Sequence, residues 1–103
     1  MKKVAVIQVP HGNSFELTAN KGTEVLSLGV MNGHLLISLL IPHGELMVKE
    51  KRNFLLVPPD AVITMDEIKF VGSVPSQKGP LFCFEVLGPV IEVAKEIPLT
   101  GLN

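Results

Sequence analysis

The stretch "VLSLGVMNGHLLISLLI", residues 25–41, decides the fold of this chain. Two apolar runs flank Asn32-Gly33, and Asn-Gly between such runs is a strong hairpin signal, because a type I′ turn needs a positive φ at both central residues. With a two-residue loop at this position, the numbers of paired residues sum to about 65. The stretch therefore predicts an antiparallel hairpin with a defined register.

Both faces of this predicted hairpin are apolar. The register places three pairs on one face, which we expect to be the core face: Leu26 with Leu39, Leu28 with Ile37, and Val30 with Leu35. The other face carries Val25 with Leu40, Ser27 with Ser38, Gly29 with Leu36, and Met31 with His34. A solvent-facing antiparallel sheet would be more polar than this. We therefore predict that one face packs in the domain core and the other on a second subunit, so that the hairpin 25–41 holds a homo-oligomer together.

Strand patterns dominate the rest of the chain as well. Runs of β-branched or alternating residues, separated by Pro, Gly and Asn clusters, predict strands at 3–9, 15–18, 45–57, 68–74 and 81–86, with a short strand or turn at 61–67. No segment has a helical period. We expect one all-β domain over 1–103, a small antiparallel sandwich or open barrel of six to eight short strands. Residues 87–103 form a tail that packs on its own subunit or swaps onto a neighbour.

Composition excludes several function classes. The 103-residue chain has a net charge of -1, neither Trp nor Tyr, and Arg52 as its only arginine, which argues against a nucleic-acid binder. No run approaches the about 18 consecutive apolar residues that a membrane helix needs. The start "MKKVAVIQVPHG" is interrupted by Gln8 and Pro10, and we interpret it as a strand rather than a signal peptide. The lone Cys83, between two phenylalanines, is predicted to be a buried thiol with a raised pKa. A cytoplasmic location fits these features.

Catalytic and metal-binding motifs are missing from the sequence. The three histidines, His11, His34 and His43, lie in or beside predicted turns, without the local ligand spacing of a zinc site. No nucleophile motif and no glycine-rich phosphate loop occurs. We therefore expect no metal, no cofactor and no enzymatic activity.

An anion site is the one ligand site that the charged residues suggest. Arg52 carries the only guanidinium, whose planar fork suits phosphate or carboxylate, and Lys49 and Lys51 flank it in "KEKR". We expect Lys78, from a polar loop, to lie nearby, and Asn53 and His34 to supply further hydrogen bonds. The alternative is a solvated charged strand in which Glu50 is the local counter-ion.

The hairpin and the segments after it resemble a family of short, uncharacterised phage and prophage β proteins. The family pattern here reads Val25-Leu26-Ser27, Asn32-Gly33, an apolar strand at 35–41, Arg52-Asn53-Phe54, Val71-Gly72-Ser73-Val74, and an aromatic strand at 82–85. The resemblance covers roughly residues 23–86. Ile37-Ser38-Leu39-Leu40 departs from the family's usual Trp-Ala-Leu-Val, Pro58-Pro59-Asp60 replaces a Thr-Gly turn, and the tail is longer. The resemblance implies a phage-encoded β protein and assigns no catalytic residue.

Three function classes follow from these observations. The first is a non-enzymatic, homo-oligomeric binding protein that captures a small anionic or nucleotide ligand, and in a phage setting it would sequester a nucleotide immune signal of the bacterial host. The second is a protein–protein module, either a virion or assembly component or an inhibitor of a host protein. The third, an enzyme, needs an acid, base or nucleophile set that the sequence does not offer. We favour the first narrowly over the second.

Overall fold

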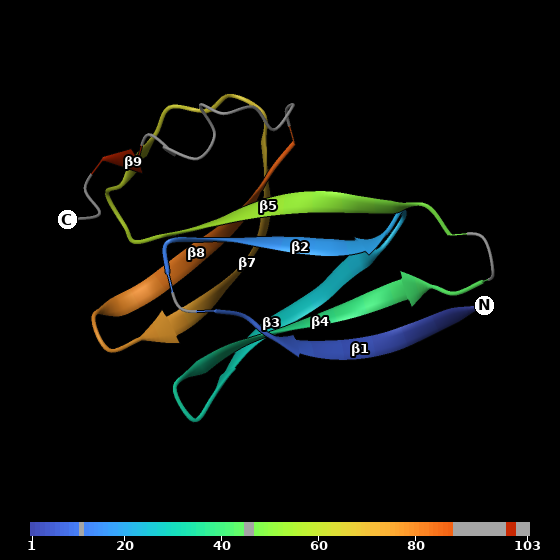
Figure 1. Cartoon of the computed structure of the whole chain (residues 1–103). Helices are drawn as coiled ribbons and strands as arrows, with labels where there is room; N and C mark the ends of the chain where they lie inside the picture. Colours follow the sequence, from blue (N-terminus) through green and yellow to red (C-terminus); the bar gives the residue numbers. More distant parts are fainter. Residues whose placement is uncertain (11, 45–46, 88–98, 101–103) are drawn as a thin grey trace.

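Two antiparallel sheets packed face to face form the protein (Figure 1) in a computed structural model that describes residues 1–10, 12–44, 47–87 and 99–100. One sheet has the strand order β1-β4-β3 and the other has the order β2-β5-β8-β7, while β6 pairs with β9. The strands are β1 (Lys2–Gln8), β2 (Ser14–Asn20), β3 (Glu24–Met31), β4 (His34–Pro42), β5 (Lys49–Val57), β6 (Val62–Ile63), β7 (Ile68–Ser76), β8 (Gly79–Val86) and β9 (Leu99–Thr100). The predicted all-β class is confirmed. No helix among the described residues is long and apolar enough to span a membrane.

The core lies between the inner faces of the two sheets. The rings of Phe15 and Phe54 stack there with centroids 4.9 Å apart, which fixes β2 against β5. Across the gap, Ile37 and Leu39 of β4 are 0% and 1% exposed. The central strands β4 and β5 thus supply the most deeply buried side chains, as expected where each strand has a neighbour on both sides.

The β3–β4 turn has the predicted conformation. Asn32 and Gly33 have φ values of 53° and 78°, as a type I′ turn requires. The predicted register holds from Met31 opposite His34 back to Ser27 opposite Ser38. Sequence pattern alone therefore located this turn and most of its pairing.

A β-bulge at Leu26 overturns the rest of the predicted register. Val25 pairs with Leu39 instead of Leu40, so Leu26 is the extra residue of the bulge. Because one extra residue exchanges the two faces of the strand, Val25 packs against the core and Leu26 is 49% exposed. Val30, also predicted to be core, is 45% exposed near the hairpin tip.

A second irregularity lies directly across from β3. The register of β7 shifts between Phe70 and Gly72, and β3 packs against β7 where the edges of the two sheets meet. A Cβ on Gly72 would lie only 3.3 Å from Cδ1 of Leu28. Glycine at this position therefore allows the two edge strands to approach closely.

The outer face of the four-stranded sheet carries part of the aromatic content. Phe70 and Phe84 meet edge to face there, with centroids 5.6 Å apart, and Phe70 is 56% exposed. Phe70 therefore lies outside the core between the two sheets. Most of the predicted tail, residues 88–98 and 101–103, lies outside the described residues.

Replacing Gly33 with alanine tests the turn. A Cβ at this positive φ costs about 1–2 kcal/mol even though no atom of the structure obstructs it, so Gly33→Ala should lower the free energy of unfolding by that amount. Gly29→Ala, in β3 without a positive φ and with equally open space, is the matched control and should have a much smaller effect. Urea unfolding measures the free energy of unfolding of both variants. An equal decrease in Gly33→Ala and Gly29→Ala would contradict the turn assignment.

Candidate functional site

Arg52 is held in an ion pair between the two sheets. Its Nε donates to Oε2 of Glu85 at 2.6 Å, and its Nη2 donates to Oε1 at 2.8 Å. Both side chains are largely buried, with exposed fractions of 17% for Arg52 and 9% for Glu85. The guanidinium also lies over the ring of Phe54, 5.8 Å from its centroid. This bidentate pair joins β5 to β8 on their inner face.

The remaining guanidinium nitrogen reaches the other sheet. Nη1 of Arg52 donates to the carbonyl of Thr23, directly before β3. Thr23 is itself fixed, because its hydroxyl donates to the carbonyl of Asn20 at 2.6 Å. The hydrogen bond with Glu85 raises the pKa of Arg52 above its ordinary value, while burial acts in the opposite direction. All three nitrogens of Arg52 are thus engaged with the protein.

This geometry corrects both interpretations of Arg52 from the sequence. Arg52 is not on a solvated strand with Glu50 as its only counter-ion, and its fork faces Glu85 rather than open solvent. A cavity of about 430 Å³ does open beside the pair, and the charged residues that line it are Glu50, Lys51, Arg52, Lys69 and Glu85. An anion there would meet the carboxylates of Glu50 and Glu85 as well as two lysines, and the guanidinium of Arg52 is already paired, so Arg52 offers this cavity no free bidentate anion site.

The larger cavity lies at the opposite end of the sandwich, and we call it the mouth cavity. It has a volume of about 800 Å³ and opens between the β3–β4 turn, the β7–β8 turn and the connection from β1 to β2. Its floor is aliphatic: Val9, Leu56 and Val74 are 2%, 7% and 4% exposed, and Leu35 and Leu81 also line it. A volume of several hundred cubic ångströms with an apolar floor is typical of a small-molecule site.

Polar groups gather on the rim of the mouth cavity. Lys78 is the one charged side chain among its described lining residues, and Asn13, Ser76 and Gln77 also line it. The β7–β8 turn that carries Lys78 is fixed by Ser76, whose Oγ accepts from the backbone N of Lys78 at 3.3 Å and donates to the carbonyl of Gly79 at 2.6 Å. The backbone N of Leu56 donates to the carbonyl of Asn13 at 2.8 Å. The rim therefore offers one positive charge and several hydrogen-bonding groups on anchored backbone.

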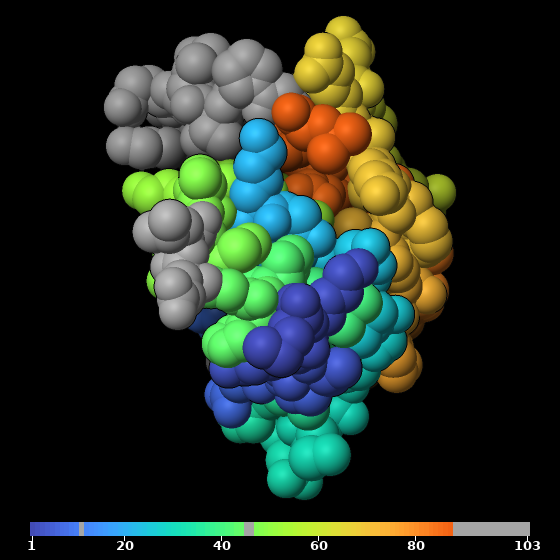
Figure 2. Space-filling view, turned by 90° about the vertical axis from the view of Figure 1, so that its right-hand side faces the viewer, coloured from blue at the N-terminus to red at the C-terminus, as the bar shows by residue number. Residues whose placement is uncertain are grey.

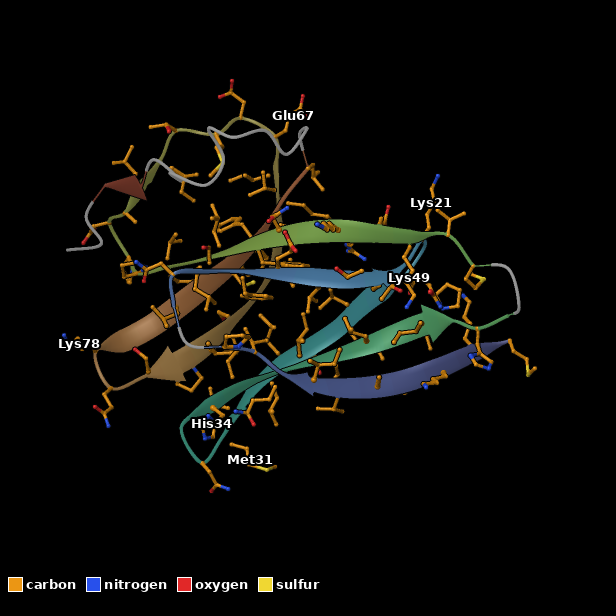
Figure 3. All side chains as sticks on the ribbon, in the orientation of Figure 1. Lys21, Met31, His34, Lys49, Glu67 and Lys78 are labelled. Carbon is orange, nitrogen blue, oxygen red and sulfur yellow. The ribbon has the colours of Figure 1, made fainter. Side chains whose placement is uncertain are left out.

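The six residues predicted to form one anion site do not come together. Lys49 and Lys78 lie at opposite ends of the molecule (Figure 3). The eight residue steps from Lys49 to the end of β5 span about 26 Å, and Lys78 lies beyond that end. Arg52 and Lys51 line the smaller cavity, whereas Lys78 lines the mouth cavity.

His34 and Asn53 line neither of the two cavities. His34 stands beside Met31 at the hairpin tip (Figure 3), and its Nδ1 lies 3.1 Å from Nε2 of Gln8. Asn53 pairs with Glu16 and Val86 in the four-stranded sheet, and its buried Nδ2 has no hydrogen-bond partner among the described residues. Neither residue lines the mouth cavity. The predicted grouping is therefore wrong, and Lys78 is its one member at the better site.

Cys83 lies in the core with 0% exposure, on the inner face of β8. Burial, together with the nearby charge of Glu85, raises the pKa of Cys83 from 9.0 to about 12. The raised pKa was predicted from the flanking phenylalanines. No group of three or more His, Cys, Asp and Glu side chains able to hold a metal ion occurs among the described residues.

Comparison with known proteins gives no match: no family model fits the chain, and neither the curated proteins nor the solved structures contain a significantly similar one.

Replacing Arg52 tests whether the ion pair is structural. Arg52→Ala leaves the buried carboxylate of Glu85 without its partner, which should lower the free energy of unfolding by about 2–4 kcal/mol. Lys51→Ala, one residue away and exposed, is the matched control and should stay within about 0.5 kcal/mol of the parent. Urea unfolding of the two variants decides the matter. A change in Arg52→Ala as small as that in Lys51→Ala would show that the pair does not stabilise the fold.

The raised pKa of Cys83 predicts a specific pH dependence. Because the folded thiol stays protonated from pH 9.0 to about 12 while the unfolded thiol ionises, its contribution to stability is complete below pH 9.0 and falls above it. The free energy of unfolding should fall by up to about 1.4 kcal/mol per pH unit in this range, and this decrease should be missing in Cys83→Ala. Urea unfolding over this alkaline range measures the difference between the two proteins. Parallel pH profiles would contradict the assignment.

Proposed function

We propose that this protein is a non-enzymatic binding protein that holds a small amphipathic anion in the mouth cavity. The observation that carries the proposal is the cavity itself, about 800 Å³ with an aliphatic floor and with Lys78 as the charged group on its described rim. Apolar surface supplies most of the affinity in such sites, and a few polar groups at the edge orient the ligand. The ligand class is therefore a compact apolar or ring-shaped body with a negative group at one end.

A more specific form of the proposal names a nucleotide. A cyclic mononucleotide carries one negative charge, which matches the single lysine of the described rim better than a triphosphate would. Its base would rest on aliphatic side chains, because no aromatic residue lines the cavity among the described residues. The resemblance to phage proteins supports sequestration of a host nucleotide signal, with the bacterial cytoplasm as the place of action.

The protein–protein module is the second candidate. The outer face of the β1-β4-β3 sheet favours it, because Val4 and Val6 are 63% and 60% exposed and Met31 is 61% exposed. An apolar face of this kind is typical of a contact surface rather than of a ligand pocket. The two candidates use different parts of the molecule and can be tested separately.

Anilinonaphthalene sulfonate, an aromatic body with a single anionic group, is a suitable first probe of the mouth cavity. We expect saturable binding of one probe per chain, measured by fluorescence titration and by native mass spectrometry. Lys78→Ala should weaken binding about three- to tenfold through loss of the charge interaction, and Leu81→Trp should also weaken it by occupying part of the apolar floor. The same mass measurement with cyclic and linear nucleotides tests the specific form of the proposal.

Two variants control for binding elsewhere. Lys69→Ala removes an exposed cation that lines the smaller cavity, and Val6→Glu places a charge on the outer face of β1. Neither should change the affinity for the probe. Affinity that falls with Lys69→Ala or Val6→Glu, but not with Lys78→Ala or Leu81→Trp, would contradict the proposed site.

A further inference from the structure

The outer face of the three-stranded sheet is an exposed surface that the ligand proposal leaves unexplained. In Figure 2, β1 (dark blue) stands at the front, and the strand order places β4 next to it and β3 beyond β4. The strand registers define the residues of this face: Lys2, Val4, Val6 and Gln8 of β1; His34, Leu36, Ser38, Leu40 and Pro42 of β4; and Glu24, Ser27, Gly29 and Met31 of β3. Leu26, in the bulge, adds to its exposed apolar area.

Charge on this face is arranged to complement itself. Lys2 lies on the edge strand β1, and Glu24 lies on the opposite edge strand β3. Both lie at the same end of the face, because Lys2 pairs with Pro42 and Glu24 pairs with Leu40 on β4. A two-fold axis that runs parallel to the strands, above β4, puts β1 of each copy over β3 of the other. Lys2 then lies two residues, about 7 Å along the strand, from the level of the partner's Glu24, which is within reach of a lysine side chain.

The same operation fixes which side chains lie opposite one another. Val6 lies at the level of the partner's small Ser27, because both pair with Ser38 of β4, and Val4 lies at the level of the partner's Glu24, because both pair with Leu40. One polar pair of the face is already satisfied, since Nε2 of Gln8 lies 3.1 Å from Nδ1 of His34. Burial of these two side chains therefore costs less than burial of unpaired polar groups.

We propose that a second copy of this chain docks on the outer face of the β1-β4-β3 sheet, with the strands parallel and Lys2 against the partner's Glu24. The face is small, because three strands about 4.8 Å apart and seven residues with a rise of about 3.3 Å each give a footprint of about 300 Å². In a complex of standard size, each partner buries about 800 Å² of accessible surface, which is more than this face provides. The dimer is therefore reversible and forms at micromolar or higher concentration. It requires nothing of the mouth cavity.

Sedimentation velocity of the full chain, from low micromolar to near-millimolar concentration, tests the contact. The parent should pass from monomer to dimer over this range. Val6→Glu would bury a charge in the centre of the contact, so this variant should remain monomeric. Val48→Glu is the matched control, because Val48 is 68% exposed and lies outside the face, and it should dimerise like the parent. A parent that stays monomeric throughout, or equal behaviour of the two variants, would overturn the proposal.

Charge reversal tests the arrangement of the two copies. Lys2→Glu and Glu24→Lys should each raise the dissociation constant about three- to thirtyfold, because two pairs become repulsive in every dimer. The double variant Lys2→Glu/Glu24→Lys should restore the parent value. Failure of the double variant to recover would overturn the parallel arrangement. Circular dichroism of each monomer confirms that the fold is retained in every variant.

Discussion

The guanidinium of Arg52 links the two sheets through its contacts with Glu85 and Thr23. One guanidinium holds the carboxylate of Glu85, 33 residues away, and the carbonyl of Thr23, directly before β3. Charges taken out of water are tolerated only where hydrogen bonds satisfy them, so β5, β8 and the start of β3 must stay in this relation to one another. Because these contacts engage all three guanidinium nitrogens, Arg52 has none free to bind a ligand. The better candidate for a binding site is the mouth cavity, at the opposite end of the sandwich.

The two ends of the sandwich therefore have different roles. At one end, Arg52 and Glu85 close the gap between the sheets, with Glu50 and Lys69 beside them. At the other end, the sheets separate around Val9, Leu56 and Val74, and the mouth cavity opens toward the turns. Turns tolerate polar and charged residues that strands of the core do not, so Lys78 can stand above an aliphatic floor. The outer face of β1 belongs to neither end, and the contact with a second copy that we propose there is independent of the cavity.

The sequence predicted local structure well and long-range structure poorly. Asn32-Gly33 imposed its own turn, and alternation from that turn gave the pairing back to Ser27. The bulge at Leu26 could not be predicted, because it lies in the strand that packs against β7, and a sequence does not show that contact. The pair between Arg52 and Glu85 was missed for the same reason. Their positions on the inner faces of neighbouring strands follow from the order β2-β5-β8-β7.

The predicted anion site failed for an instructive physical reason. Lys49, Lys51 and Arg52 are close in sequence, but alternation along β5 sends Arg52 to the inner face and the two lysines to the outer one. Lys78 lies in the β7–β8 turn, beyond the far end of the same strand. A signal for the mouth cavity was nevertheless present, in the three turn-rich segments around Gly12, Gly33 and Gln77. Only the topology shows that these turns share one end of the sandwich.

We propose that ligand binds at the mouth cavity and not at Arg52. Amide chemical-shift mapping by NMR, during titration with anilinonaphthalene sulfonate, distinguishes the two places. We expect shifts confined to the amides around Asn13, Leu35 and Lys78, while the amides of Thr23, Lys51 and Glu85 stay unchanged. Shifts centred on Thr23, Lys51 and Glu85 would contradict this proposal and return Arg52 to the role of ligand-binding residue.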